Sequence, residues 1–96
     1  MRLIALEHEL KPLDSATAAE VLRSEAAALW ELQQAGLVRE SHFRADRKEA
    51  VLVLEAGSVA EAETRLSAMP LVREGYIRFE LIPLVPYDGY ARLFAH

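Results

Sequence analysis

The sequence predicts one small α+β domain in which two helices cover one face of a four-stranded antiparallel sheet. Stretches with strand periodicity and stretches with helix periodicity alternate along the chain, and single glycines and prolines separate them. About half of the 96 residues are hydrophobic (52%), which is enough for one core and too little for two. We therefore expect a single domain over residues 1–96, stabilised by association into a homodimer or a higher homo-oligomer.

The first strand is predicted over residues 2–9. This stretch is apolar on both alternations until the polar residues 7–9, as in a central strand with a polar end. Pro12 then breaks the strand.

The first helix is predicted to open near Asp14 or Ser15 and to stop at Gly36. Thr17 and Glu20 have the spacing of an alternative capping box at its start. At about 1.5 Å per residue this helix is long enough to cross a sheet.

The next two strands are predicted to form a hairpin. Residues 37–45 alternate and carry several charges, as an edge strand does. The turn is predicted at residues 46–49. Residues 50–54 are continuously apolar, which places them at the centre of the sheet.

A second helix and a last strand follow. Ser58 and Glu61 form a capping box, and Pro70 is predicted to end this helix. Its buried stripe is Val59, Ala62, Leu66 and Met69. Residues 76–82 alternate between two faces, so we expect a strand that Pro83 closes.

The resulting order is βαββαβ. Right-handed crossovers then give a ferredoxin-like antiparallel sheet in the order 4-1-3-2, with both helices on one face. The other face lacks a cover within the chain, and a second subunit is its simplest cover. The tail over residues 83–96 is rich in aromatic residues and proline, so we expect it to lie against a neighbouring subunit. The alternative is that it packs back on its own domain.

Glu25 is the candidate with the clearest chemical signal. Wound at 100° per residue, the first helix places it on the same arc as six apolar side chains. These are Ala18, Val21, Leu22, Ala26, Leu29 and Leu32. Removing a carboxylate from water costs several kcal/mol or forces it to take up a proton. Glu25 is therefore either a general base with a raised pKa or one half of an ion pair with a strand arginine.

Four further side chains are candidates, each with a structural alternative. His42 and His8 could assist acid-base chemistry, because the pKa of histidine lies close to neutrality, or they are surface or interface histidines. Tyr76 could donate a hydrogen bond to an enolate oxygen or line a subunit interface. Trp30, at the rim of the apolar arc, suits a pocket wall or plain packing.

Several classes of function are disfavoured. Without cysteine there is no disulfide, no thiolate nucleophile and no sulfur metal site. The histidines lack metal-ligand spacing and the glycines form no phosphate loop, so we expect no metal and no cofactor. The net charge of -4 argues against nucleic acid or an anionic membrane as the partner. The first apolar run is too short for a signal peptide or a membrane span, and we expect a cytoplasmic protein.

The joint spacing of several motifs resembles the muconolactone isomerase family over roughly residues 1–82. The motifs are Glu25-x3-Leu29-x2-Leu32-Gln33-x2-Gly36-x2-Arg39, then Ser58-Val59-x-Glu61-Ala62, then Leu66-x2-Met69-Pro70-Leu71. The resemblance implies a dimeric α+β barrel and a cofactor-free isomerase of aromatic-compound catabolism that moves a proton on a small unsaturated lactone acid. It also implies that Glu25 is the acidic residue of the family's first helix.

An enzyme of this kind needs a cation for the substrate carboxylate, and Arg39, Arg44 and Arg78 are available. Arg39 and Arg44 are our candidates, although each could be a solvated strand charge. The first hypothesis is thus a cofactor-independent isomerase or related lyase of small carboxylated lactones or enones. The alternatives are a non-catalytic oligomeric module that binds a small organic acid, and a cofactor-free monooxygenase of the same barrel architecture.

Overall fold

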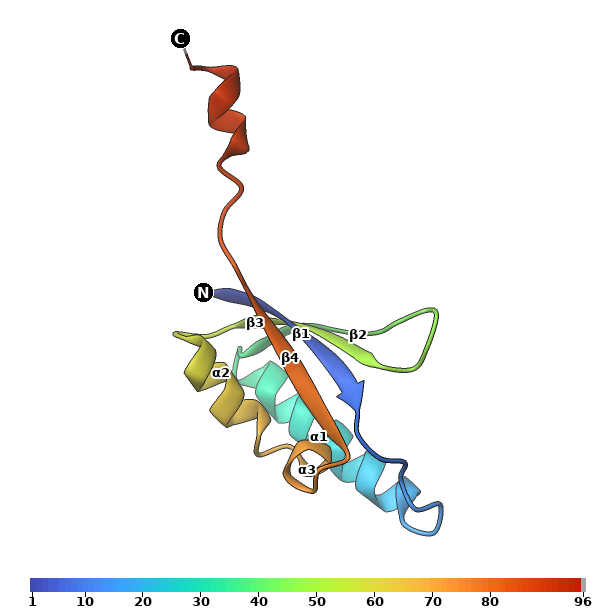
Figure 1. Ribbon diagram of the computed structural model, residues 1–96. Helices are drawn as coiled ribbons and strands as arrows, with labels where there is room; N and C mark the ends of the chain where they lie inside the picture. Colours follow the sequence, from blue (N-terminus) through green and yellow to red (C-terminus); the bar gives the residue numbers. More distant parts are fainter. Residues whose placement is uncertain (96) are drawn as a thin grey trace.

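The computed structural model describes residues 1–95 and has the predicted element order; His96, the last residue of the expected tail, lies outside the described residues. The elements are β1 (Arg2–Glu9), α1 (Ala18–Gln34), β2 (Val38–Phe43), β3 (Ala50–Glu55), α2 (Val59–Leu66), α3 (Pro70–Arg73), β4 (Ile77–Leu84) and the 3₁₀ helix η1 (Gly89–Leu93). The four strands form an antiparallel sheet in the order β2-β3-β1-β4, and the helices α1 to α3 lie on one of its faces (Figure 1). The ferredoxin-like α+β fold is therefore confirmed.

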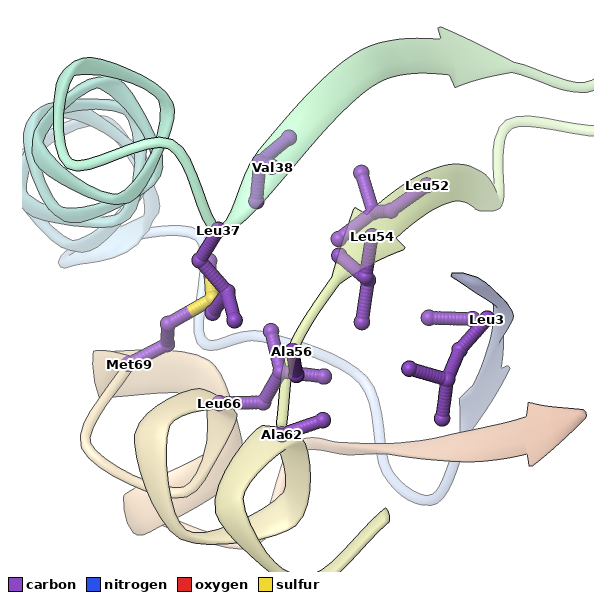
Figure 2. Close-up of a cluster of buried hydrophobic side chains, with 10 residues drawn as sticks. Leu3, Leu37, Val38, Leu52, Leu54, Ala56, Ala62, Leu66 and Met69 are labelled. Carbon is purple, nitrogen blue, oxygen red and sulfur yellow. The ribbon is translucent and has the colours of Figure 1, made fainter. Parts of the chain in front are cut away.

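The core lies between the helices and one end of the sheet. The central strands β1 and β3 present Leu3 and Leu54 toward the helices, and neither is exposed to solvent. Side chains from α2 and from the turns on both sides of it meet them (Figure 2). The fully or nearly buried residues of this cluster are Leu3, Ala5, Leu37, Val38, Leu52, Leu54, Ala56, Ala62, Leu66 and Met69. The predicted buried stripe of the second helix is thus confirmed, with Val59 partly buried at its edge.

The first helix begins later than predicted. Asp14 Oδ1 accepts a hydrogen bond from the Ala16 N–H at 2.9 Å, and the Thr17 N–H bonds to the Asp14 carbonyl oxygen. This local turn competes with helix formation, so α1 opens only at Ala18. Thr17 occupies the cap position without a side-chain cap bond, and the capping box predicted with Glu20 does not form.

The second helix begins as predicted and ends differently. Ser58 Oγ accepts a hydrogen bond from the Glu61 N–H at 3.1 Å, and Glu61 reaches back to the Gly57 N–H at 2.8 Å. The helix ends at Leu66, before Pro70. Pro70 instead opens the short helix α3, because its fixed φ and missing N–H suit the first helical position.

The two edge strands differ in length from the prediction. β2 covers six residues rather than the expected 37–45, because Arg44 and Glu49 already belong to the turn, where the Arg44 N–H bonds to the Glu49 carbonyl oxygen. β4 continues through Pro83, which pairs with Leu3. An edge strand tolerates proline, since the missing N–H can face away from the ladder.

The face of the sheet opposite the helices is open and partly apolar. Ile4 is paired with Val53 on one side and with Ile82 on the other, so these three side chains share that face. Ile82 and Leu84 keep 37% and 40% of their surface exposed. Nothing within residues 1–95 covers this face, as Figure 1 shows.

The tail after β4 extends away from the domain and ends in η1 (Figure 1). Val85, Tyr87 and Phe94 keep 88%, 71% and 75% of their surface exposed, so within this chain the tail does not pack back on the domain. The radius of gyration of 16.0 Å exceeds the value of about 12.5 Å for a compact chain of this length. None of the helices over residues 1–95 combines the length and the apolar character needed to cross a bilayer.

Candidate functional site

A cavity of about 560 Å³ lies between α1 and the sheet, at the end where β1 finishes and β4 begins. Its walls are largely apolar. They are formed by Leu22, Ala26 and Leu29 of α1, by Leu52, Ile77 and Phe79 of the strands, and by Phe43, Met69 and Leu71. α1 has no fully buried residue, and Leu22 is 48% exposed. The apolar arc predicted from the sequence therefore forms, between Leu22 and Leu29, the wall of a pocket.

The cavity lies where the side chains on the helix-facing side of β1 change from apolar to acidic. Leu3, Ala5, Glu7 and Glu9 alternate onto that side. The first two are buried in the core, whereas Glu7 and Glu9 line the cavity. Acidic side chains cannot pack tightly against the apolar arc of α1, so a space remains there.

Glu25 projects from α1 into this space. It is half-buried, and its Oε1 accepts a hydrogen bond from the Leu71 N–H at 2.9 Å. That N–H lies in the first turn of α3, where no partner exists within the helix. Burial raises the pKa of Glu25 above its ordinary value, the bond from Leu71 lowers it, and the negative charge of Glu7 raises it further.

Glu7 is a second half-buried carboxyl in the same cavity, on the sheet side. Its Oε1 accepts a hydrogen bond from the Ala50 N–H at 3.1 Å, at the start of β3. Burial is the largest cause that raises its pKa, the Ala50 N–H opposes it, and the charges of Glu49 and Glu9 add to it. Sequence reasoning missed Glu7 as a site residue. The signal was available, because it shares the alternation of Leu3 and Ala5.

Two ammonium groups lie at the exposed rim of the cavity. Lys11 Nζ lies 4.6 Å from the centroid of the Tyr76 ring, and Lys48 Nζ lies 5.5 Å from that of Phe43. Both lysines and both rings line the cavity. The site thus combines carboxyl groups on its walls with cations at its mouth, an arrangement that suits an organic anion with an apolar body.

Tyr76 is a predicted candidate that the structure places in the cavity. The sequence predicted it on the face of the last strand opposite Ile77, but it precedes β4 and follows Gly75, whose φ is +77°. Its backbone N–H bonds to the Leu71 carbonyl oxygen, so strand alternation does not govern its side chain. The ring consequently lines the same cavity as Ile77.

The two candidate histidines lie on the open face of the sheet. His8 Nε2 is 2.8 Å from Glu80 Oε1, and His42 Nε2 is 3.1 Å from Glu40 Oε1. In the single chain neither histidine lines the cavity.

The two candidate arginines and Trp30 also lie outside the cavity. Arg39 Nε donates to the Gly36 carbonyl oxygen at 2.7 Å, at the end of α1. Arg44 donates two hydrogen bonds to Asp46 in the hairpin, at 2.9 and 2.6 Å. Trp30 keeps 59% of its surface exposed on α1. Among residues 1–95, no group of three or more histidine, cysteine, aspartate and glutamate side chains could hold a metal ion.

The fold is that of small α+β enzymes solved earlier. Over 92% of both chains, this chain superimposes on muconolactone isomerase with a TM-score of 0.78 and 22% identity. It also superimposes on the 5-chloro-2-hydroxyhydroquinone dehydrochlorinase of Burkholderia phenoliruptrix, solved in complex with 2,5-dihydroxybenzoquinone. That match has a TM-score of 0.63 and 13% identity, and it covers 93% of this chain and 98% of that one. No family model and no curated protein matches the sequence. The resemblance to muconolactone isomerase is thus confirmed in the fold.

Proposed function

We propose that this protein is a cofactor-independent isomerase of the muconolactone isomerase type, which moves a proton on a small unsaturated lactone or enone acid. The observation that carries the proposal is Glu25, a half-buried carboxyl group with a raised pKa on the wall of an apolar cavity. A carboxyl group whose pKa is moved toward neutrality can both take and return a proton at working pH.

In this proposal the Glu25 carboxylate removes a proton from a carbon next to the substrate carbonyl. Tyr76 donates a hydrogen bond to the oxygen on which the negative charge develops. A substrate that fills the space between the apolar walls displaces water from both groups, which strengthens both interactions. Lys11 and Lys48 attract the substrate carboxylate to the mouth of the cavity.

The size of the cavity supports a small substrate. A volume of about 560 Å³ lies within the range of roughly 300–1,000 Å³ that small-molecule pockets occupy. The names of the two structural neighbours point the same way, since one acts on muconolactone and the other was solved with a dihydroxybenzoquinone. We infer that the ligand is a single oxygenated ring with an acidic group.

The roles predicted for His8, His42, Arg39 and Arg44 stay predictions. In the single chain these side chains lie away from the cavity, so such a role requires that a neighbouring subunit brings them to another copy's site. We propose that the protein works as a homo-oligomer, as its open sheet face indicates, and that it acts in the cytoplasm.

The test is proton NMR in D2O on a panel of muconolactone-type and enol-lactone acids, with and without the protein. We expect exchange at carbon and new isomer signals for at least one member. If members bind, as seen by ligand line broadening, but none exchanges, the protein is the non-catalytic binding module instead. The bond from Leu71 to Glu25 then has a structural role only, as a cap for the first turn of α3.

A further inference from the structure

The cavity holds a carboxyl group on each of two opposing walls. Glu25 comes from the helix layer, and Glu7 comes from the central strand β1 of the sheet layer. A ring seated between the two layers therefore has one carboxyl group on its helix side and one on its sheet side.

Both carboxyl groups are oriented, and both keep an oxygen available. One oxygen of each, Oε1, accepts a backbone N–H, from Leu71 in one case and from Ala50 in the other. The second oxygen of each accepts no hydrogen bond from residues 1–95. A backbone donor fixes the position of the side chain, and the remaining oxygen is the one that can exchange a proton with a ligand.

We propose that Glu7 is the second proton-transfer group of the site: Glu25 removes the proton from one carbon, and Glu7 delivers a proton to the other. This inference rests on the proposed isomerase function and adds to it a division of labour between two side chains.

The step balances without a cofactor. The bond between hydrogen and the first carbon breaks, the proton passes to the Glu25 carboxylate, and the electron pair moves into the conjugated system to give a dienolate. Glu7, protonated at the start, gives its proton to the remote carbon, where a new C–H bond forms. The double bond has then moved. A proton passed from Glu25 to Glu7, directly or through solvent, restores the starting state.

The surroundings raise the pKa of both carboxyl groups, and burial is the largest cause for each. The negative charge of Glu7 also raises the pKa of Glu25, so the ionisation of one carboxyl group opposes that of the other. The remaining ionisable groups that line the cavity or act on the pair are Glu9, Glu49, Lys11, Lys48 and Tyr76. The negative charges of Glu9 and Glu49 also raise the pKa of Glu7. The positive charges of the two lysines favour the ionised carboxylates. Both lysines are exposed at the rim, so solvent and salt screen this effect.

Glu7→Gln tests this role while preserving the fold. The glutamine oxygen can still accept the Ala50 N–H, but the side chain can no longer transfer a proton. With a substrate from the D2O panel, we expect exchange at the first carbon to fall less than tenfold and isomer formation to fall at least a hundredfold. We also expect the wild-type product to carry deuterium at the new C–H bond from the first turnover. Protium transferred from one carbon to the other within the first turnover would contradict a two-group mechanism.

Comparing Glu7→Gln with Glu25→Gln and with a control variant separates the role of Glu7 from the proposed isomerase function. Glu31→Gln, on the exposed side of α1, removes one charge and should isomerise at the wild-type rate. Unchanged isomer formation in Glu7→Gln, together with its loss in Glu25→Gln, overturns the role of Glu7 alone. Unchanged formation in both overturns the roles of Glu25 and Glu7 together, whereas a wild type that forms no isomer from any member of the panel overturns the isomerase assignment.

Carbon-13 titration of the glutamate side chains needs no substrate. We expect Glu7→Gln to lower the apparent pKa of Glu25, and Glu25→Gln to lower that of Glu7. If the apparent pKa of each glutamate is the same with and without the substitution of the other, the two groups do not share a site, and the inference is overturned.

Discussion

At the scale of single residues, the half-buried Glu25 carboxylate lowers the stability of the fold but suits proton transfer in the cavity. A carboxylate that leaves water loses hydration that one backbone N–H only partly replaces. The bond from Leu71 is the compensation, and the raised pKa of Glu25 shows that burial outweighs it. Such a balance is typical of functional groups, where a raised pKa serves the chemistry rather than the stability.

Glu25→Gln should stabilise the fold in a pH-dependent way. The pKa of Glu25 is raised above its ordinary value of 4.5. At a pH between the ordinary pKa of the unfolded state and the raised pKa of the folded state, the folded state binds more protons than the unfolded state. The stability of the wild type therefore falls as the pH rises through that window. The uncharged glutamine lacks this loss. The stability advantage of the variant should be absent at a pH well below 4.5, where both states are protonated, and should grow as the pH rises through the window above it; it stays small because the cavity admits solvent.

Urea unfolding between pH 4 and 8 measures this difference, with Glu31→Gln as the control that removes a charge from the exposed side of the same helix. A variant less stable than the wild type at pH 8 would show that the Glu25 carboxylate is part of a net stabilising contact.

At the scale of elements, the cap of α2 is the clearest local determinant. Ser58 accepts the Glu61 N–H, and Glu61 accepts the Gly57 N–H, so two backbone donors at the start of an eight-residue helix are satisfied. α2 carries Ala62 and Leu66 into the core, which links this cap to the stability of the whole domain.

Ser58→Ala should lower the free energy of unfolding by about 1 kcal/mol, because the Glu61 N–H loses its partner. Chemical unfolding followed by circular dichroism is the measurement, and Thr17→Ala is its matched control. Thr17 occupies the equivalent position of α1 without a side-chain cap bond, so its substitution should cost much less. Equal losses at both positions would contradict this account of the cap.

The helices and strands were predicted correctly where the hydrophobic periodicity is clear. Their ends were predicted less well where a local turn competes with the helix or strand. The continuous apolar run of β3 and the alternation of β4 placed both strands correctly. Asp14 delayed the first helix through a side-chain bond that competes with capping, and Pro83 was tolerated because β4 is an edge. Neither effect depends on the residue type alone.

Two of the candidates named from the sequence, Glu25 and Tyr76, line the cavity, and the other charged residues of the cavity were not predicted. Glu25 stood out because it breaks an apolar arc within one element. Glu7, Lys11 and Lys48 join it only after β1, the loops and α1 are brought together, and no spacing in the sequence links them to Glu25. His8 and His42 were attractive for their chemistry, but the register of the sheet puts them on the opposite face.

At the scale of the whole molecule, the open sheet face and the extended tail indicate assembly. Apolar side chains of β1, β3 and β4 share that face. The tail holds exposed aromatic residues, of which Tyr87 and Tyr90 pack edge to face with their centroids 4.8 Å apart. Surfaces of this kind are typical of subunit interfaces. We propose that a second copy covers the sheet, in a dimeric α+β barrel, and that the tail contacts a neighbouring subunit.

Ile4→Lys should convert the oligomer to monomers. Ile4 lies at the middle of the open face, and a lysine there would place an unpaired charge in the interface at a cost of several kcal/mol, or a dimer dissociation constant raised at least a hundredfold. Sedimentation velocity measures the change. Ala60→Lys, on the exposed side of α2, adds the same charge elsewhere and should leave the assembly intact. A wild-type protein that sediments as a monomer at micromolar concentration would contradict the proposal.

The central claim is that Glu25 transfers a proton in the cavity, and one comparison tests it most directly. The rate of deuterium incorporation at carbon is measured by proton NMR in D2O for the wild type, Glu25→Gln and Glu31→Gln, with the best substrate of the lactone-acid panel. We predict a loss of at least a hundredfold for Glu25→Gln, the usual contribution of a general base, and an unchanged rate for Glu31→Gln. Incorporation that continues at the wild-type rate in Glu25→Gln would contradict the claim.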